Sequence, residues 1–218
     1  MKSESNKLAV RGELALIAMV IMNSAGVLLM LHSGSGISAI SSVPYGFQQV
    51  FPQLTLGTWT YMFQGLLVLV LMLLRRKFIP SYLFSFVVGF VFGKLMDLEK
   101  PFIDALPLNI PMRVLYFVLS YLILCFGISL GNRCGLPITP TDLFPREMAD
   151  ITKLPYARVK ITFDLTCLIT TAVITFVGVG AIRGLGIGTV VAACTMGKGI
   201  SFIGSLLDKR LTFHSVLD

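Results

Sequence analysis

The sequence predicts an all-α membrane protein in which six transmembrane helices form two inverted-topology repeats of three helices. Two observations support this fold class. Of the 218 residues, 55% are hydrophobic and only 13% are charged, whereas soluble domains carry about 25% charged residues. Six apolar runs also approach the roughly 20 residues that a helix needs to cross the hydrocarbon core, and the runs fall into two similar sets.

The six runs give the chain its expected order. They lie near residues 13–31, 55–74, 81–98, 113–131, 160–178 and 186–207. None shows the period-two alternation typical of a transmembrane barrel, so we interpret them as helices. We expect tails at residues 1–12 and 208–218, one repeat at 13–98 and a second at 113–207.

The net charge of +7 predicts orientation and not nucleic-acid binding. Lys and Arg gather in alternate links, and such clusters favour the cytoplasmic side of a membrane. These clusters contain Lys2, Lys7, Arg11, Arg75, Arg76, Lys77, Arg146, Lys153, Arg158, Lys160, Lys209 and Arg210. We therefore expect both termini in the cytoplasm. The first run has a counterpart later in the chain, so we interpret it as a helix and not as a cleaved signal.

The internal repeat is clearest in the third helix of each half. Residues 89–94 (GFVFGK) correspond to residues 193–198 (ACTMGK), and Phe63-Gln64 corresponds to Phe163-Asp164. A unit of three helices is odd, so the second copy enters from the opposite side, as in several secondary transporters. The alternative is that polytopic segments share Gly and aromatic residues through composition alone. The small-xxx-small pairs favour close helix packing and are equally compatible with a homodimer.

A proline-rich polar segment at residues 132–147 interrupts the apolar pattern after the fourth helix. The first half has a matching break, SGSGISAISSVPYGFQ, with Gly36 corresponding to Gly135. Irregular backbone at membrane depth needs protein or a wet cavity around it. We expect each segment to re-enter the membrane, and Pro140-Thr141-Asp142 resembles a helix start. The alternative is an amphipathic helix, Thr141 to Lys153, on the membrane surface.

Ionisable residues inside the helices are the sharpest functional signals. Lys94 and Lys198 occupy matching places and predict a shared polar interior, with snorkelling to the interface as the alternative. Asp164 is a proton-coupling group, a ligand for a cationic group, or the partner in a structural ion pair with Arg133, Lys160 or Lys198. Asn23 and Ser24 either hydrogen-bond between helices or line a cavity.

We expect a substrate site between the two halves. Its predicted residues are Tyr61, Gln64, Lys94, Arg133, Thr139, Thr141, Asp142, Asp164 and Lys198. Cations outnumber carboxylates there, which favours an anionic or zwitterionic substrate. The sequence has no catalytic signature, and its four cysteines lack metal-type spacing, so we expect no enzyme, cofactor or metal site.

The chain resembles the YczE/YyaS/YitT group of bacterial integral membrane proteins. The resemblance covers about residues 10–207 and rests on GISAISSVPYGF and LTLGTWTY in the first half. In the second half it rests on GNRCGLPITPTDLFPRE, ITFDL and the glycine-rich last helix. It implies a bacterial cytoplasmic-membrane protein and implies no substrate.

These features favour a small-solute transporter whose partners are the lipid bilayer, a small-molecule substrate and a second copy of the chain. A first alternative is a substrate-capture subunit that docks on an energy-coupling ATPase, and co-purification with an ATPase pair would identify it. A second is a non-transporting partner of a membrane enzyme. Apolar replacements of Lys94 and Asp164 would leave that function intact.

Overall fold

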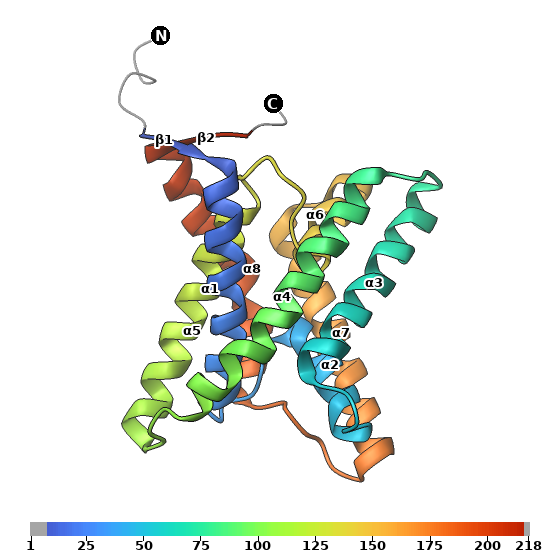
Figure 1. Ribbon diagram of the computed structural model, residues 1–218, viewed down its shortest axis with the longest axis vertical. Helices are drawn as coiled ribbons and strands as arrows, with labels where there is room; N and C mark the ends of the chain where they lie inside the picture. Colours follow the sequence, from blue (N-terminus) through green and yellow to red (C-terminus); the bar gives the residue numbers. More distant parts are fainter. Residues whose placement is uncertain (1–7, 216–218) are drawn as a thin grey trace.

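The chain is almost entirely helical in the computed structural model, which describes residues 8–215 (Figure 1). Lys2, Lys7 and residues 216–218, which belong to the expected tails, lie outside the described residues. Six helices are long and apolar enough to cross a membrane, which confirms the predicted multi-pass, all-α class. They are α1 (Gly12–His32), α3 (Leu56–Arg75), α4 (Pro80–Asp104), α5 (Ile110–Gly131), α7 (Tyr156–Val179) and α8 (Ile187–Arg210).

Two shorter helices, α2 (Ala39–Val50) and α6 (Pro140–Thr152), follow α1 and α5. Their first turns are buried and their last residues are more exposed. The residue before each helix has nearly the same backbone conformation, with φ −59° and ψ 144° at Ser38 and φ −53° and ψ 139° at Thr139. Each helix contains an internal proline, Pro44 or Pro145. The sequence-predicted broken segments are therefore short helices with buried N-termini.

The helices form two groups that meet along α4 and α8. One group, here called the α1/α5 bundle, contains α1, α4, α5 and α8, with α1 packed along α5. The other, the α2/α6 bundle, contains α2, α3, α6 and α7, with α2 packed on α7 and α3 on α6. Figure 1 shows the two short helices displaced towards opposite ends of the molecule. The bundles contact each other mainly through α3 against α4 and α7 against α8.

Glycines allow the closest helix approaches in this arrangement. Gly93 of α4 lies against the Gly57 carbonyl of α3, and Gly197 of α8 lies against the Ala157 carbonyl of α7. A methyl group at either glycine would collide with the facing backbone. In lipid the hydrophobic effect does not drive helices together, so they associate through close packing. Small residues at the crossings allow that packing. The small-xxx-small pairs thus serve packing within the chain.

Both described ends of the chain meet at one end of the molecule. Strand β1 (Leu8–Arg11) pairs in parallel with β2 (Leu211–His214), with Leu8 opposite Leu211. The α3–α4 turn and the α6–α7 turn lie at the same end (Figure 1). We call it the basic end because most of the Lys and Arg clusters lie there. These clusters include Arg75, Arg76, Lys77, Lys153, Lys209 and Arg210.

Candidate functional site

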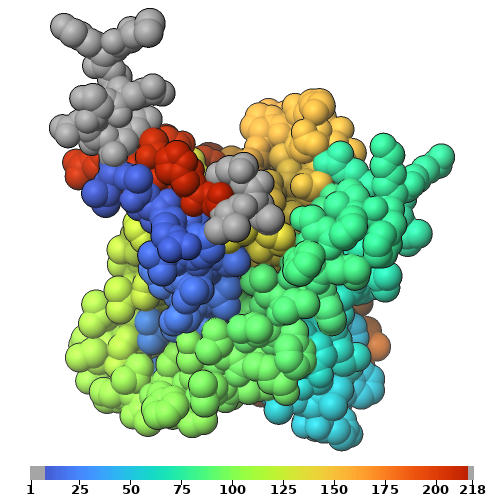
Figure 2. Space-filling model, turned by 45° about the horizontal axis from the view of Figure 1, so that its top comes forward, coloured from blue at the N-terminus to red at the C-terminus, as the bar shows by residue number. Residues whose placement is uncertain are grey.

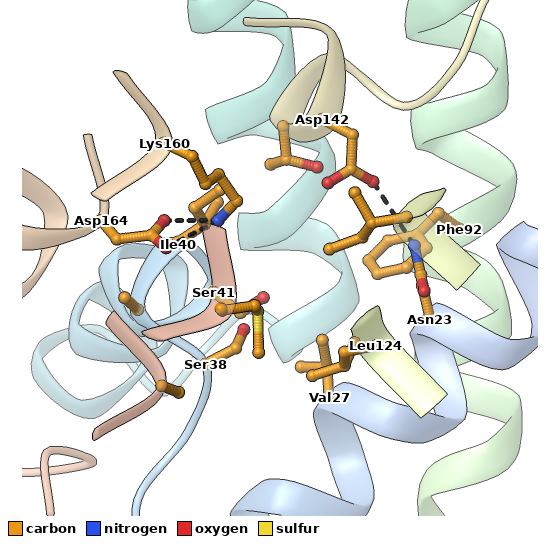
Figure 3. Close-up of a pocket in the computed structure, with 15 residues that line it drawn as sticks. Asn23, Val27, Ser38, Ile40, Ser41, Phe92, Leu124, Asp142, Lys160 and Asp164 are labelled. Carbon is orange, nitrogen blue, oxygen red and sulfur yellow. Dashed lines mark hydrogen bonds and ion pairs between the residues drawn. The ribbon is translucent and has the colours of Figure 1, made fainter. Parts of the chain in front are cut away.

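A small buried cavity lies where the two bundles meet and the N-termini of α2 and α6 approach each other (Figure 3). Its volume is about 40 Å³. A cavity needs roughly 10–15 Å³ to hold one water molecule, so this one has room for an ion or a few waters. Its polar lining comes from Asn23, Ser38, Ser41, Thr141, Asp142, Lys160 and Asp164, and its apolar lining includes Val27, Phe92, Leu124, Ile128 and Met196.

A buried ion pair forms one wall of the cavity. Lys160 Nζ donates to both carboxylate oxygens of Asp164, at 2.6 and 2.7 Å. The two residues are one helical turn apart on α7 and are 2% and 1% exposed. Pairing at this spacing is what a helix surface allows, and burial of either charge alone would be costly. Of the alternatives raised by the sequence, Lys160 is the ion-pair partner of Asp164.

Asp142, in the first turn of α6, forms the opposite wall. Thr139 Oγ1 donates to Asp142 Oδ2 at 2.8 Å, and Asn23 Nδ2 donates to the same oxygen at 3.4 Å. Both donors are neutral, so Asp142 has no direct ion pair within residues 8–215. An acidic residue in the first helical turn is favoured by the helix dipole. The site thus holds one carboxylate, Asp164, with both oxygens bonded to a cation, and a second, Asp142, that has no cation bonded to it among the described residues.

The N-terminus of α2 reaches the cavity with hydroxyl groups in place of charge. Ser38 and Ser41 are 8% and 7% exposed, and Figure 3 shows both side chains directed towards the cavity. Neither hydroxyl has a hydrogen-bond partner among residues 8–215, and Ser38 does not cap its own helix. The first turn of α2 contains no acidic residue. The first N–H groups of a helix lack acceptors within it, so this helix end presents donors without a counter-charge.

A wider pocket opens at the basic end. It has a volume of about 480 Å³ and is lined by Ser81, Phe84, Asn132, Arg133, Gly135, Leu136, Pro137 and Arg146. Figure 2 shows residues of the connection between α5 and α6 (yellow) recessed between α1 (blue) and α6 (gold). Arg133 Nε and Nη2 bond to the Asp208 carboxylate at 2.5 and 2.7 Å. Arg146 has no ion-pair partner in the described part of the chain.

An ionic cluster fastens the far end of α6. Arg75 Nη2 at the end of α3 donates to Glu147 at 2.7 Å and to Asp150 at 2.8 Å. The Tyr82 hydroxyl of α4 donates to the same Glu147 oxygen. The hydrogen bond from Arg75 holds the pKa of the exposed Asp150 carboxyl below its usual range. This cluster ties α6 to both helices of the α3–α4 hairpin.

The structure does not bring Lys94 and Lys198 to the cavity. Both side chains are exposed on the outside of their helices, and Lys94 Nζ lies 5.6 Å from the centre of the Phe90 ring on the same helix. The expectation that these lysines face a shared polar interior is therefore wrong. Lys94 and Lys198 stand at matching places in the predicted repeat, and both lie on the outside of their helices.

The remaining predicted residues divide into three groups. Asp142, Asp164 and Thr141 line the cavity, and Thr139 donates a hydrogen bond to Asp142. Gln64 is fully buried beside Gly89 and Pro140, close to the start of α6, and neither amide atom has a partner in residues 8–215. Tyr61 is half-buried against Phe90, and Arg133 lies at the basic end.

Two parts of the site were not among the predicted residues. Lys160 stood at the expected boundary of the fifth helix and was interpreted as part of a basic loop, although its spacing from Asp164 indicates the pair. Ser38 and Ser41 carry no charge, and the helix that positions them was predicted only as a broken segment. In the described residues no group of three or more His, Cys, Asp and Glu could hold a metal ion.

The chain belongs to a family of unknown function, DUF6198, whose family model matches residues 10–205. No curated protein matches the chain, and no solved structure matches it. The family match does not carry the YczE/YyaS/YitT name, so that closer resemblance stays a prediction. The family supplies no activity, and a function has to be argued from the cavity and the helices around it.

Proposed function

We propose that this protein is a small-solute transporter whose substrate site is the cavity between the α1/α5 and α2/α6 bundles. The observation that carries the proposal is the meeting of two short-helix N-termini at one buried polar cavity between two groups of helices. Transporters often bind substrates at the ends of discontinuous helices near the middle of the membrane. The basic end then faces the cytoplasm, as its excess of Lys and Arg favours.

Matching contacts support an inverted repeat, with α1–α4 corresponding to α5–α8. Contacts of α2 with α7 correspond to those of α6 with α3, and contacts of α1 with α4 correspond to those of α5 with α8. Single residues follow the same rule. Gly26 lies against Leu124, whereas Gly127 lies against Asn23. Asn23 stands three residues before Gly26 and Leu124 three residues before Gly127, so the two contacts mirror each other. A pseudo-two-fold axis would then pass through the cavity, which is lined by corresponding residues of both halves.

In this proposal the α2/α6 bundle moves against the α1/α5 bundle and exposes the cavity to each side in turn. The carried substrate is small because about 40 Å³ is available. The anionic preference expected from Lys94, Arg133 and Lys198 loses that basis, because none of these cations lines the cavity. Any preference for charge has to come from Lys160, the two carboxylates and the helix ends.

The direct test is access to the cavity from both sides of the membrane. Ser41→Cys is placed in a background in which Cys125, Cys134, Cys167 and Cys194 are replaced by Ala, and the protein is sealed into vesicles. A membrane-impermeant thiol reagent added to either side alone is expected to label Cys at this position. A matched control, Thr171→Cys, stays unlabelled, because Thr171 is fully buried against α2 away from the cavity. Labelling from one side only, or from neither, would contradict transport.

One observation favours a second function, that of a non-transporting partner of another membrane protein. Both oxygens of Asp164 are bonded to Lys160, as expected of a pair that only stabilises the fold. A double variant in which Met replaces Lys160 and Leu replaces Asp164 separates the two functions. A stabilising partner keeps its activity in that variant, whereas a transporter loses a charged wall of its site.

A further inference from the structure

The charges around the cavity set the class of ligand that it accepts. Lys160 and Asp164 neutralise each other through two short hydrogen bonds. Two helix N-termini add partial positive charge. That of α6 is offset by Asp142, but the first turn of α2 has no acidic residue. The uncompensated positive end is therefore that of α2.

Unpaired donors lie beside that end. Ser41 is a buried residue, and its hydroxyl has no partner within residues 8–215 and is directed into the cavity (Figure 3). Ser38 shares these properties, and Lys160 Nζ uses two of its three hydrogens on Asp164. Together with the free N–H groups of the first turn, these form a cradle of hydrogen-bond donors. Such a cradle at a helix start binds anions.

Asp142 decides when an anion can enter. The groups facing it are Lys160, Asp164 and Tyr156 of α7, Arg146 of its own helix and Asn23 of α1. With Asp142 ionised, the three charged groups of the cavity sum to one negative charge, which repels an anion. With Asp142 protonated they sum to zero, and the helix ends leave a positive potential. Asp164 cannot take this role without first losing its bonds to Lys160.

We propose that the cavity binds one small monovalent anion against the first turn of α2, together with one proton on Asp142. The anion and the proton enter and leave as a neutral pair, so no net charge crosses the membrane with them. The cavity volume limits the anion to a halide or a species of a few atoms, such as formate. Arg146, which has no ion-pair partner in the described residues and lines the pocket at the basic end, would attract anions on that side. This inference rests on the proposed transport function.

Proteoliposomes that contain the full chain and a trapped pH dye test the proposal with fluoride, chloride and formate as separate probes. For at least one of them, uptake is expected to rise as the external pH falls, to acidify the lumen and to be insensitive to membrane potential. Asp142→Asn is expected to abolish the pH dependence, because the amide stays neutral. Ser41→Ala is expected to raise KM roughly tenfold, the effect of losing one hydrogen bond to a charged group, with the pH dependence unchanged.

The control Ser205→Ala, on the exposed face of α8, is expected to match the wild type. Asp164→Asn is a comparison variant, which is expected to lose flux at all pH values without a shift in the pH profile. The proposal is overturned if no probe anion is taken up, or if Asp142→Asn keeps the wild-type pH dependence. Two-sided labelling of Ser41→Cys without anion uptake would overturn this inference and leave the transport proposal standing. If there were neither two-sided labelling nor anion uptake, both this inference and the transport proposal would be overturned.

Discussion

The two short helices, α2 after α1 and α6 after α5, are held in different ways. α2 contains no charged residue. It is fixed by a backbone bond from Ile37 to Gly184 at 2.9 Å and by the hydroxyl pair Ser42–Thr171 at 2.7 Å. α6 is fixed at its far end by the cluster of Arg75, Glu147 and Asp150. Buried neutral contacts resist changes of pH and salt, whereas half-exposed ion pairs are weak and screened. The α6 side is therefore the easier side to open.

The largest expected effect comes from Lys160, which pairs with Asp164 on α7. In the predicted repeat, the uncharged residues Thr60 and Gln64 of α3 stand at the matching places. Lys160→Met leaves a buried carboxylate without its cation and is expected to cost about 3–5 kcal/mol of unfolding free energy. Combining Lys160→Met with Asp164→Leu should restore stability to within about 1 kcal/mol of the wild type. Unfolding in mixed micelles by a denaturing detergent measures both. A double variant as unstable as the single one would contradict the pairing.

The packing that holds α2 can be broken at Gly36. This residue has φ +104°, and a Cβ there would lie 2.1 Å from Thr189 Oγ1 and 2.6 Å from the Gly186 nitrogen. Gly36→Ala is expected to cost more than about 2 kcal/mol, because a clash adds to the cost of a positive φ. Gly180→Ala is the matched control, since Gly180 has φ +75° and open space around it. It should cost only about 1 kcal/mol. If both variants lost the same unfolding free energy in this assay, the close contact of Gly36 with Thr189 and Gly186 would not contribute to stability.

Gln64 of α3 differs from Asp164 of α7 because its buried polar atoms have no partner within residues 8–215. Its amide nitrogen and oxygen are buried and lack partners in the described residues. An unsatisfied buried polar group costs about 1–3 kcal/mol, so Gln64→Leu should raise the unfolding free energy by about 1 kcal/mol or leave it unchanged. Thr60→Val on the same helix, which removes a hydroxyl bonded to the Leu56 carbonyl, serves as the control. A strong loss in Gln64→Leu would indicate that the amide holds a ligand or water.

The smallest effect is expected at the ionic cluster of α6. Arg75→Gln should lower overall stability by less than about 1 kcal/mol, because these ion pairs are partly exposed to solvent. Backbone amides of α6 should exchange faster with deuterium in this variant, and those of α2 should not change. Lys153→Gln removes a more exposed pair with Asp150 and is the control. Faster amide exchange in both α2 and α6 would contradict the inference that different contacts hold the two helices.

The difference in α6 amide exchange between the wild type and Arg75→Gln should depend on pH, because Asp150 is titratable. Arg75 lowers the pKa of the folded-state carboxyl, so the contribution of the pair is present above the ordinary carboxyl pKa of about 4. It is lost as the pH falls through the lowered folded-state value. The exchange rates of wild type and Arg75→Gln should therefore converge only in strongly acidic solution. Convergence near neutral pH would point to another group.

The sequence predicted the number of spanning helices well and their faces poorly. Charges at Glu99 and Lys100 ended the third predicted run near residue 98, although α4 continues to Asp104. The outward position of Lys94 and Lys198 could not be read from periodicity, because a helix facing lipid is as apolar outside as inside. Asp164 could be identified because a carboxylate among apolar residues needs a partner, and Asp142 because Pro140-Thr141-Asp142 resembles a helix start. Ser38 and Ser41 could not, because their role comes from the helix start that holds them.

The connections between the two bundles have a mechanical consequence. Four links join them, at residues 33–38, 76–79, 132–139 and 180–186, and each contains at least one residue with positive φ. These are Gly34, Gly36, Arg76, Gly135, Gly180 and Gly184. Short segments at the ends of helices are where large dihedral changes are absorbed in hinge motions. Rotation of one bundle against the other would thus be shared among four pivots, and the helices themselves would not need to bend.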